Sequence, residues 1–109
     1  MMFSNRLLGL LLLLVLFSAS PALAHKVNIF AFVESGTVFT ESYFADGKPV
    51  IDGKVQVFDS EDELLLEGHS DRQGMWQFSV PKHEDLTLVV NAGLGHKGTF
   101  RLKKSVMGR

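Results

Sequence analysis

The sequence predicts an all-β protein, a small antiparallel β-sandwich of seven strands that follows an N-terminal signal peptide. Two observations predict this fold. Apolar and polar residues alternate with a period of two in short segments, and turn residues interrupt these segments about every 8 to 12 positions. No segment after residue 24 has the periodicity of an amphipathic helix. The chain also lacks cysteine, so packing rather than disulfide bonds must stabilise the fold.

The first 24 residues have the pattern of a secretory signal. Arg6 supplies the early positive charge, residues 7–17 form an apolar run, and Ala22 and Ala24 match the small-x-small cleavage pattern. The apolar run is shorter than the about 20 residues that a membrane-spanning helix needs. We therefore expect cleavage after Ala24 and a periplasmic or secreted protein, with no transmembrane helix in the mature chain.

Composition limits what the mature chain does. Cleavage leaves 85 residues, enough for one small domain, with 10 Lys and Arg against 12 Asp and Glu. This near-neutral balance argues against a nucleic-acid-binding protein. We expect a sandwich domain over residues 25–104 and a polar C-terminal tail over residues 105–109.

Seven segments have the composition of β-strands, being rich in β-branched and aromatic residues. We expect Val50, Val55 and Val57 to line one face of the third strand, and Trp76 and Phe78 to point inward from the fifth. The predicted strands cover residues 27–34, 37–44, 50–59, 64–69, 75–80, 86–90 and 97–103.

The first two strands form a predicted hairpin with two apolar faces. Ser35 and Gly36 supply the turn, and alternation places four aromatic residues on the second face, namely Phe30, Phe32, Phe39 and Tyr43. We favour the interpretation that this aromatic face packs beneath a loop. The alternative is a docking surface for a partner.

The middle third of the chain resembles the carboxypeptidase regulatory-like, transthyretin-type sandwich domains. The resemblance rests on residues 47–59 and 68–78, in which Ser70 stands where threonine is usual and Trp76 where phenylalanine is usual. This residue pattern has a physical basis, since Asp71 can cap a turn and Gly74 can take a positive φ at its end. This resemblance implies the fold and says little about function.

The mature chain as a whole resembles the periplasmic accessory components of bacterial energy-coupling-factor nickel or cobalt transporters. Three segments carry this likeness, at residues 25–34, 40–44 and 91–97, including H-K-V-N at the predicted cleavage site and A-G-L-G-H-K near the C-terminus. The resemblance implies a Ni(II) or Co(II) protein whose partners are the membrane subunits of a transporter.

Export itself would create the best metal ligand. If cleavage follows Ala24, His25 becomes the first residue and offers both its α-amine and its imidazole Nδ1 to one metal ion. His96 lies in a glycine-rich connection, and a sandwich could bring this loop to the end at which the first strand starts. Glu41 is a further candidate, whereas His69 and His83 are more simply explained as exposed side chains.

Nitrogen ligands of this kind suit Ni(II) or Cu(II), and the general affinity order favours copper. We expect a nickel-handling protein, with Co(II) as a second metal. The alternatives are a regulatory-like structural or interaction module without metal and a periplasmic copper-binding protein. We expect no enzyme activity, because no serine elbow motif and no spaced carboxylate pair is present.

Overall fold

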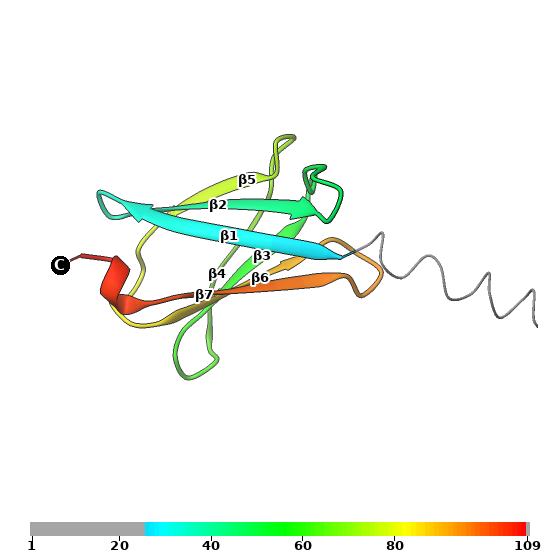
Figure 1. Ribbon diagram of the computed structural model, residues 1–109. Coiled ribbons are helices and arrows are strands. Elements are labelled where there is room, and N and C mark those ends of the chain that lie inside the picture. Colours follow the sequence, from blue (N-terminus) through cyan, green and yellow to red (C-terminus); the bar gives the residue numbers. More distant parts are fainter. Residues whose placement is uncertain (1–25, 109) are drawn as a thin grey trace, which may run out of the picture.

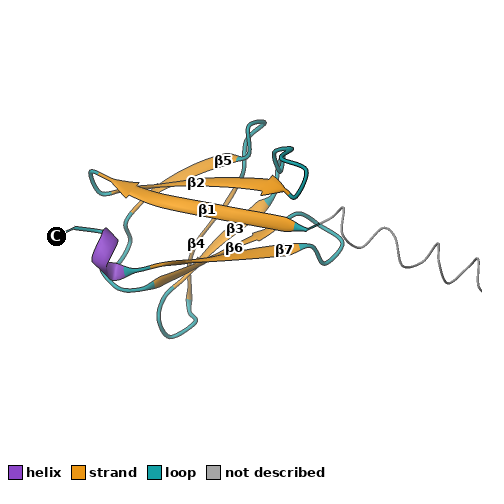
Figure 2. Cartoon of the chain, in the orientation of Figure 1, coloured by secondary structure: helices purple, strands orange, loops and turns teal. Residues whose placement is uncertain are grey.

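The computed structural model describes residues 26–108, which form two antiparallel β-sheets packed face to face (Figures 1 and 2). The three-stranded sheet has the order β1-β2-β5, and the four-stranded sheet has the order β4-β3-β6-β7. The predicted all-β sandwich of seven strands is therefore confirmed. The elements are β1 (Val27–Glu34), β2 (Thr37–Phe44), β3 (Lys54–Phe58), β4 (Leu64–His69), β5 (Met75–Ser79), β6 (Leu86–Asn91), β7 (Lys97–Leu102) and the short 3-10 helix η1 (Lys104–Val106).

The core lies between the two sheets and follows the period-two pattern of the sequence. The buried side chains of β1 are Val27, Ile29 and Ala31, and each alternates with a more exposed residue. The four-stranded sheet buries the opposing side chains, namely Val55, Val57, Leu86, Leu88, Val90 and Leu102. Burial of each large aliphatic side chain contributes about 1.5 to 3 kcal/mol, which gives a domain without disulfides its stability.

Two glycines let the sheets approach closely along their edges. A Cβ on Gly98 of β7 would lie 2.6 Å from the carbonyl oxygen of Val27, so only glycine permits β7 to pass this close to β1. On the opposite side, a Cβ on Gly68 of β4 would overlap the indole ring of Trp76. Trp76 therefore fills the space beside β4, and its ring lies 5.0 Å from that of Phe78.

The β3–β4 and β4–β5 turns share one hydrogen-bond pattern. In the β3–β4 turn, Asp59 Oδ1 accepts hydrogen bonds from the N–H groups two and four residues later. Asp71 Oδ1 does the same in the β4–β5 turn. The residue three positions after each aspartate has a positive φ, 62° at Asp62 and 78° at Gly74. The predicted capping by Asp71 and the positive φ of Gly74 are confirmed.

The structure departs from the predicted third strand. Val50 is buried as expected, but β3 begins only at Lys54, because Asp52 has a φ of 56° and interrupts the extended backbone. Ser70 joins this segment to the core: its Oγ accepts a hydrogen bond from Gly53 N–H and donates one to the carbonyl of Val50. Near the C-terminus, Met107 follows η1 and is 5% exposed within the core.

Candidate functional site

The start of β1 and the β6–β7 loop lie at the same end of the sandwich. Gly98, at the beginning of β7, approaches the backbone of Val27 and Asn28, and Figure 1 shows the orange loop beside the cyan start of β1. At the same end, the carbonyl of Lys26 accepts a hydrogen bond from Ala45 N–H. The chain therefore enters the described domain next to the loop that carries His96.

The backbone of the β6–β7 loop holds His96 in a defined position. Its N–H donates to the carbonyl of Gly93 over 3.0 Å, and its carbonyl accepts from Ala92 N–H over 2.9 Å. Gly93, Leu94 and Gly95 all have positive φ values, of 92°, 55° and 80°. This tight left-handed turn explains the glycines on either side of Leu94 and leaves the imidazole of His96 partly exposed.

His25, the other predicted ligand, lies outside the described residues, as do the signal segment and its cleavage site. Within residues 26–108, no three His, Cys, Asp or Glu side chains come together as a metal-binding group. Glu41 pairs with Phe30, and the first pair of these two strands is Val27 with Phe44. These two pairs are three register positions apart, so Glu41 lies about 10 Å along the strand from the end at which β1 starts. Glu41 therefore lies away from the β6–β7 loop.

The remaining histidines do not join His96. His69 ends β4 and lies in a groove together with Glu41 and Asp71. His83 is exposed in the connection between β5 and β6. The exposed positions expected for His69 and His83 are therefore confirmed.

A groove of about 490 Å³ runs along the outer face of the three-stranded sheet and reaches around its β5 edge to His69 at the end of β4. Cross-strand pairing aligns the outward side chains of β1, β2 and β5, so that Phe39 lies between Phe32 and Gln77. We call this the aromatic groove. Its lining residues are Phe30, Phe32, Phe39, Thr40, Glu41, His69, Asp71, Met75, Trp76 and Gln77.

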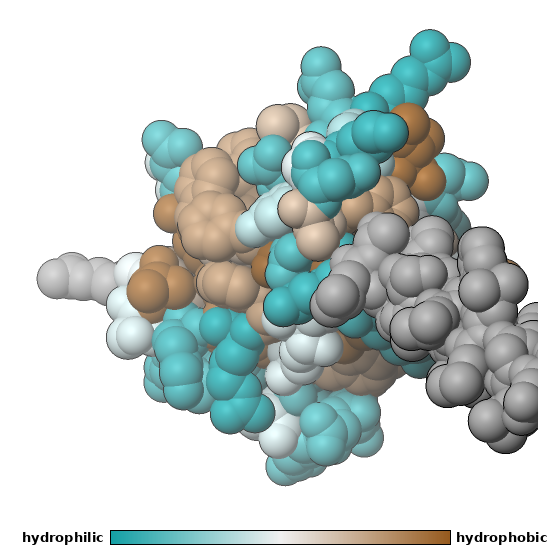
Figure 3. All heavy atoms as spheres, turned by 45° about the vertical axis from the view of Figure 1, so that its right-hand side comes forward, coloured by the Kyte–Doolittle hydropathy of each residue, from teal (hydrophilic) through white to brown (hydrophobic). Residues whose placement is uncertain are grey.

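The rings in the aromatic groove form a continuous series. Phe32 stacks on Phe39 with centroids 5.3 Å apart, Phe30 lies 6.2 Å from Phe32, and Phe30 meets Phe100 of β7 edge-on at 5.6 Å. Tyr43, predicted on the same face, is not among the residues that line the groove. Figure 3 shows a broad apolar area on one side of the molecule with hydrophilic residues beside it, and smaller groups of apolar atoms elsewhere in the view.

The favoured interpretation of the aromatic face, that it packs beneath a loop, is wrong for its two phenylalanines on β1. Phe30 and Phe32 are each 47% exposed, and Met75 of β5 is 45% exposed. The reason is topological: the core lies on the opposite side of the three-stranded sheet, and no described loop crosses its outer face. Met75 and Gln77 also line this groove and were not predicted to do so, although their alternation with the inward-pointing Trp76 and Phe78 places them on the outer face.

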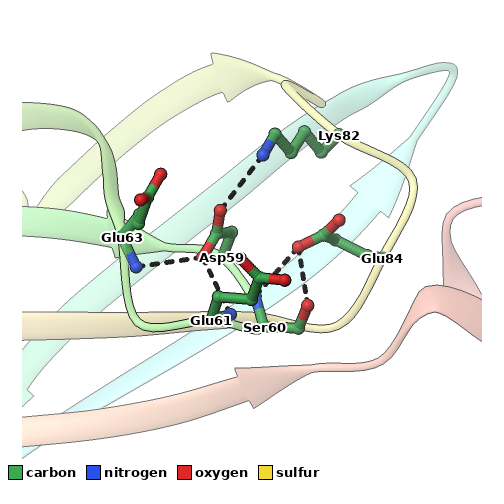
Figure 4. A network of polar contacts seen from close by, with 6 residues as sticks. All are labelled: Asp59, Ser60, Glu61, Glu63, Lys82 and Glu84. Atoms are coloured by element: carbon green, nitrogen blue, oxygen red, sulfur yellow. Dashed lines mark hydrogen bonds and ion pairs between the residues drawn. The ribbon is translucent and has the colours of Figure 1, made fainter.

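A polar network at the C-terminal end of β3 joins the β3–β4 turn to the connection between β5 and β6 (Figure 4). Glu63 N–H donates to Asp59, which lowers the pKa of that carboxyl; burial opposes this shift, and Lys82, 3.1 Å away, reinforces it. The hydrogen bond to Asp59 in turn raises the pKa of Lys82. The N–H and hydroxyl of Ser60 both donate to Glu84 and lower its pKa. These groups satisfy one another, so we assign the network to loop stability.

Comparisons with known proteins give one informative relative. A Haemophilus influenzae protein described as uncharacterized is 32% identical over an alignment of 81 residues, which covers 72% of this chain and 50% of the relative. The chain thus spans about half the length of that relative. No protein-family model and no solved structure matches the chain.

The described part of the chain, residues 26–108, has no helix with the length and apolar character needed to cross a membrane.

Proposed function

We propose that this protein is a periplasmic accessory protein that binds Ni(II) and passes it to the membrane subunits of a metal transporter, with Co(II) as a second cargo. His25, through its amine and imidazole, and His96 are the proposed ligands. The observation that supports this proposal best is the close approach of Val27 and Asn28, which follow His25 by two and three residues, to Gly98 of the β7 strand that follows His96. The proposal assigns no enzymatic reaction to the chain.

The proposed ligand set makes metal binding depend on pH. The terminal amine has a reference pKa of about 7.7 to 8.0 and imidazole of about 6.5, and both must lose a proton to bind a metal. Affinity therefore falls as the pH decreases from about 8 to 6, first through protonation of the terminal amine and then through protonation of the His25 imidazole. This behaviour suits a protein that releases its metal to a partner.

Calorimetric titration with Ni(II), Co(II) and Cu(II) tests the proposal. The protein is expressed as the full 109-residue chain, exported, purified and analysed by mass spectrometry to identify its first residue. A second protein carries one glycine inserted after Ala24, which separates the terminal amine from the histidine ring. We expect Ni(II) to bind the first protein and to lose most of its affinity for the second.

A matched pair of substitutions locates the second ligand. His96→Ala should weaken Ni(II) binding, whereas His83→Ala, which removes an exposed histidine from another loop, should leave it unchanged. Absence of heat with every metal would favour a structural module, and a preference for Cu(II) far above the general affinity order would favour a copper protein. A first residue other than His25 would reject the amine chelate.

A further inference from the structure

The charged side chains that line the aromatic groove, Glu41 and Asp71, are both acidic. Arg101 and Lys103 line a separate pocket together with Phe32, at the other end of the groove. The outward positions of β1, β2 and β5 carry two carboxylates, Glu34 and Glu41, and neither lysine nor arginine. The outward face of the four-stranded sheet has the opposite character, with Lys54, Lys97 and Arg101 against Glu67. An apolar ligand with a positive charge therefore fits the end of the groove that carries Glu41 and Asp71.

The aromatic groove also borders an open strand edge. β5 pairs with β2 along one edge, and no strand within residues 26–108 pairs with its other edge. Hydrogen bonds from Ser42 N–H to the Gly74 carbonyl and from Val80 N–H to the Gly36 carbonyl fix the register, so the even-numbered residues of β5 turn their backbone groups toward β2. The backbone N–H and C=O groups of Gln77 and Ser79 consequently face outward, at the rim of the groove.

The start of that edge is protected. The N–H of Met75 donates to Asp71 Oδ1, and its carbonyl accepts from Asp71 N–H, so the β4–β5 turn covers this residue. The open stretch is thus limited to Gln77 and Ser79. A short extended segment matches this length better than a complete additional strand.

We propose that the aromatic groove and the β5 edge bind an extended segment of a partner protein that carries apolar side chains together with lysine or arginine. The segment pairs its backbone with Gln77 and Ser79, places apolar side chains against Phe32 and Phe39, and directs a cation toward Glu41. Desolvation of the exposed rings supplies affinity, and the backbone pairing sets orientation. This proposal does not depend on metal binding.

The protein is expressed as the full 109-residue chain, exported and purified, and is then titrated with the capped peptide Lys-Thr-Val-Thr-Phe-Thr-Lys. NMR follows the backbone amides of the protein during the titration. We expect shifts at β5 and at the groove, and binding that weakens as salt concentration rises. The same peptide with glutamate in place of both lysines should bind at least about tenfold more weakly. Of two peptides N-methylated at odd or at even positions, only one should lose binding, since alternate N–H groups face the edge.

Matched variants separate the groove from general charge. Glu41→Lys should weaken peptide binding about tenfold. Glu67→Lys, which makes the same charge change on the outer face of the other sheet, should leave it unchanged. Phe32→Ser should also reduce binding, and preserved amide spectra establish that each variant is folded.

Other occupants of the groove give distinct results, each of which overturns the proposal. Self-association in sedimentation experiments that Phe32→Ser abolishes would identify a second copy of the chain. Co-sedimentation with phosphatidylcholine vesicles that the same variant abolishes would identify a lipid surface. Lack of peptide binding, equal binding of the glutamate peptide, or equal effects of Glu41→Lys and Glu67→Lys would also reject it.

Discussion

Replacing Ser70 with alanine should lower the free energy of unfolding by about 2 to 4 kcal/mol. The Ser70 hydroxyl is 2.9 Å from the N–H of Gly53 and 2.5 Å from the carbonyl oxygen of Val50, and Ser70 is 4% exposed. Its loss leaves one buried donor and one buried acceptor unpaired, and each such group costs about 1 to 3 kcal/mol. We place the total below the sum because the segment before β3 can relax.

Ser42 provides a matched control within the same core. It is 0% exposed, and its Oγ has no hydrogen-bond partner in the described part of the chain. Ser42→Ala removes a buried hydroxyl without orphaning another group, so it should be neutral or stabilising by up to about 1 kcal/mol. Ser70→Thr, which keeps the hydroxyl, should retain most of the stability lost in Ser70→Ala.

Urea unfolding followed by the fluorescence of Trp76, the single tryptophan of the chain, measures these differences. For a small domain the slope is about 1 kcal/mol per molar urea, so the Ser70→Ala midpoint should fall by about 2 to 4 M. A Ser70→Ala stability within about 0.5 kcal/mol of the parent, or an equal loss of stability in Ser42→Ala, would contradict this prediction.

Three further predictions concern turns, pH and edge packing. Gly74→Ala should lower the free energy of unfolding by more than about 1 kcal/mol, since Gly74 has a φ of 78° and a Cβ there would overlap a carbonyl of β2. Asp62→Gly, at the equivalent position of the β3–β4 turn, should be neutral or stabilising. The urea assay described above measures both. Because Asp59 has a lowered pKa, its stabilisation is complete above the unfolded pKa of about 3.9 and is lost as pH falls through the folded value. Asp59→Asn should therefore flatten the acid limb of a stability–pH curve, and an unchanged limb would contradict this. Gly68→Ala should displace Trp76 and shift its emission, whereas an unaltered spectrum with full stability would show that the ring is not held there.

Much of the fold was predictable because it depends on local pattern. Period-two alternation located the seven strands, and the aspartate and glycine of the β4–β5 turn follow from backbone stereochemistry alone. Val50 was assigned to a strand because, in sequence alone, a buried valine in a loop looks the same as a buried valine in a strand. Only the positive φ of Asp52, which aspartate tolerates without requiring, separates it from β3.

The candidate sites were less predictable, since they combine distant segments. The sequence pattern does not predict that β5 pairs with β2 and so places Met75 and Gln77 beside the aromatic residues of the hairpin. The two faces of that hairpin are both apolar, so the pattern could not decide which would be covered. Pairing order decided it, because the four-stranded sheet packs on one face only.

The sequence by itself determined the alternation that makes strands, the turns that separate them and the histidine residues available as ligands. Tertiary structure decided which of these residues meet. It brought the start of β1 to the loop that carries His96, kept Glu41 on another face, and left the phenylalanines of β1 partly in water. The physical reason is that alternation is a property of neighbouring residues, whereas the order and stacking of sheets depend on contacts between residues far apart in the chain.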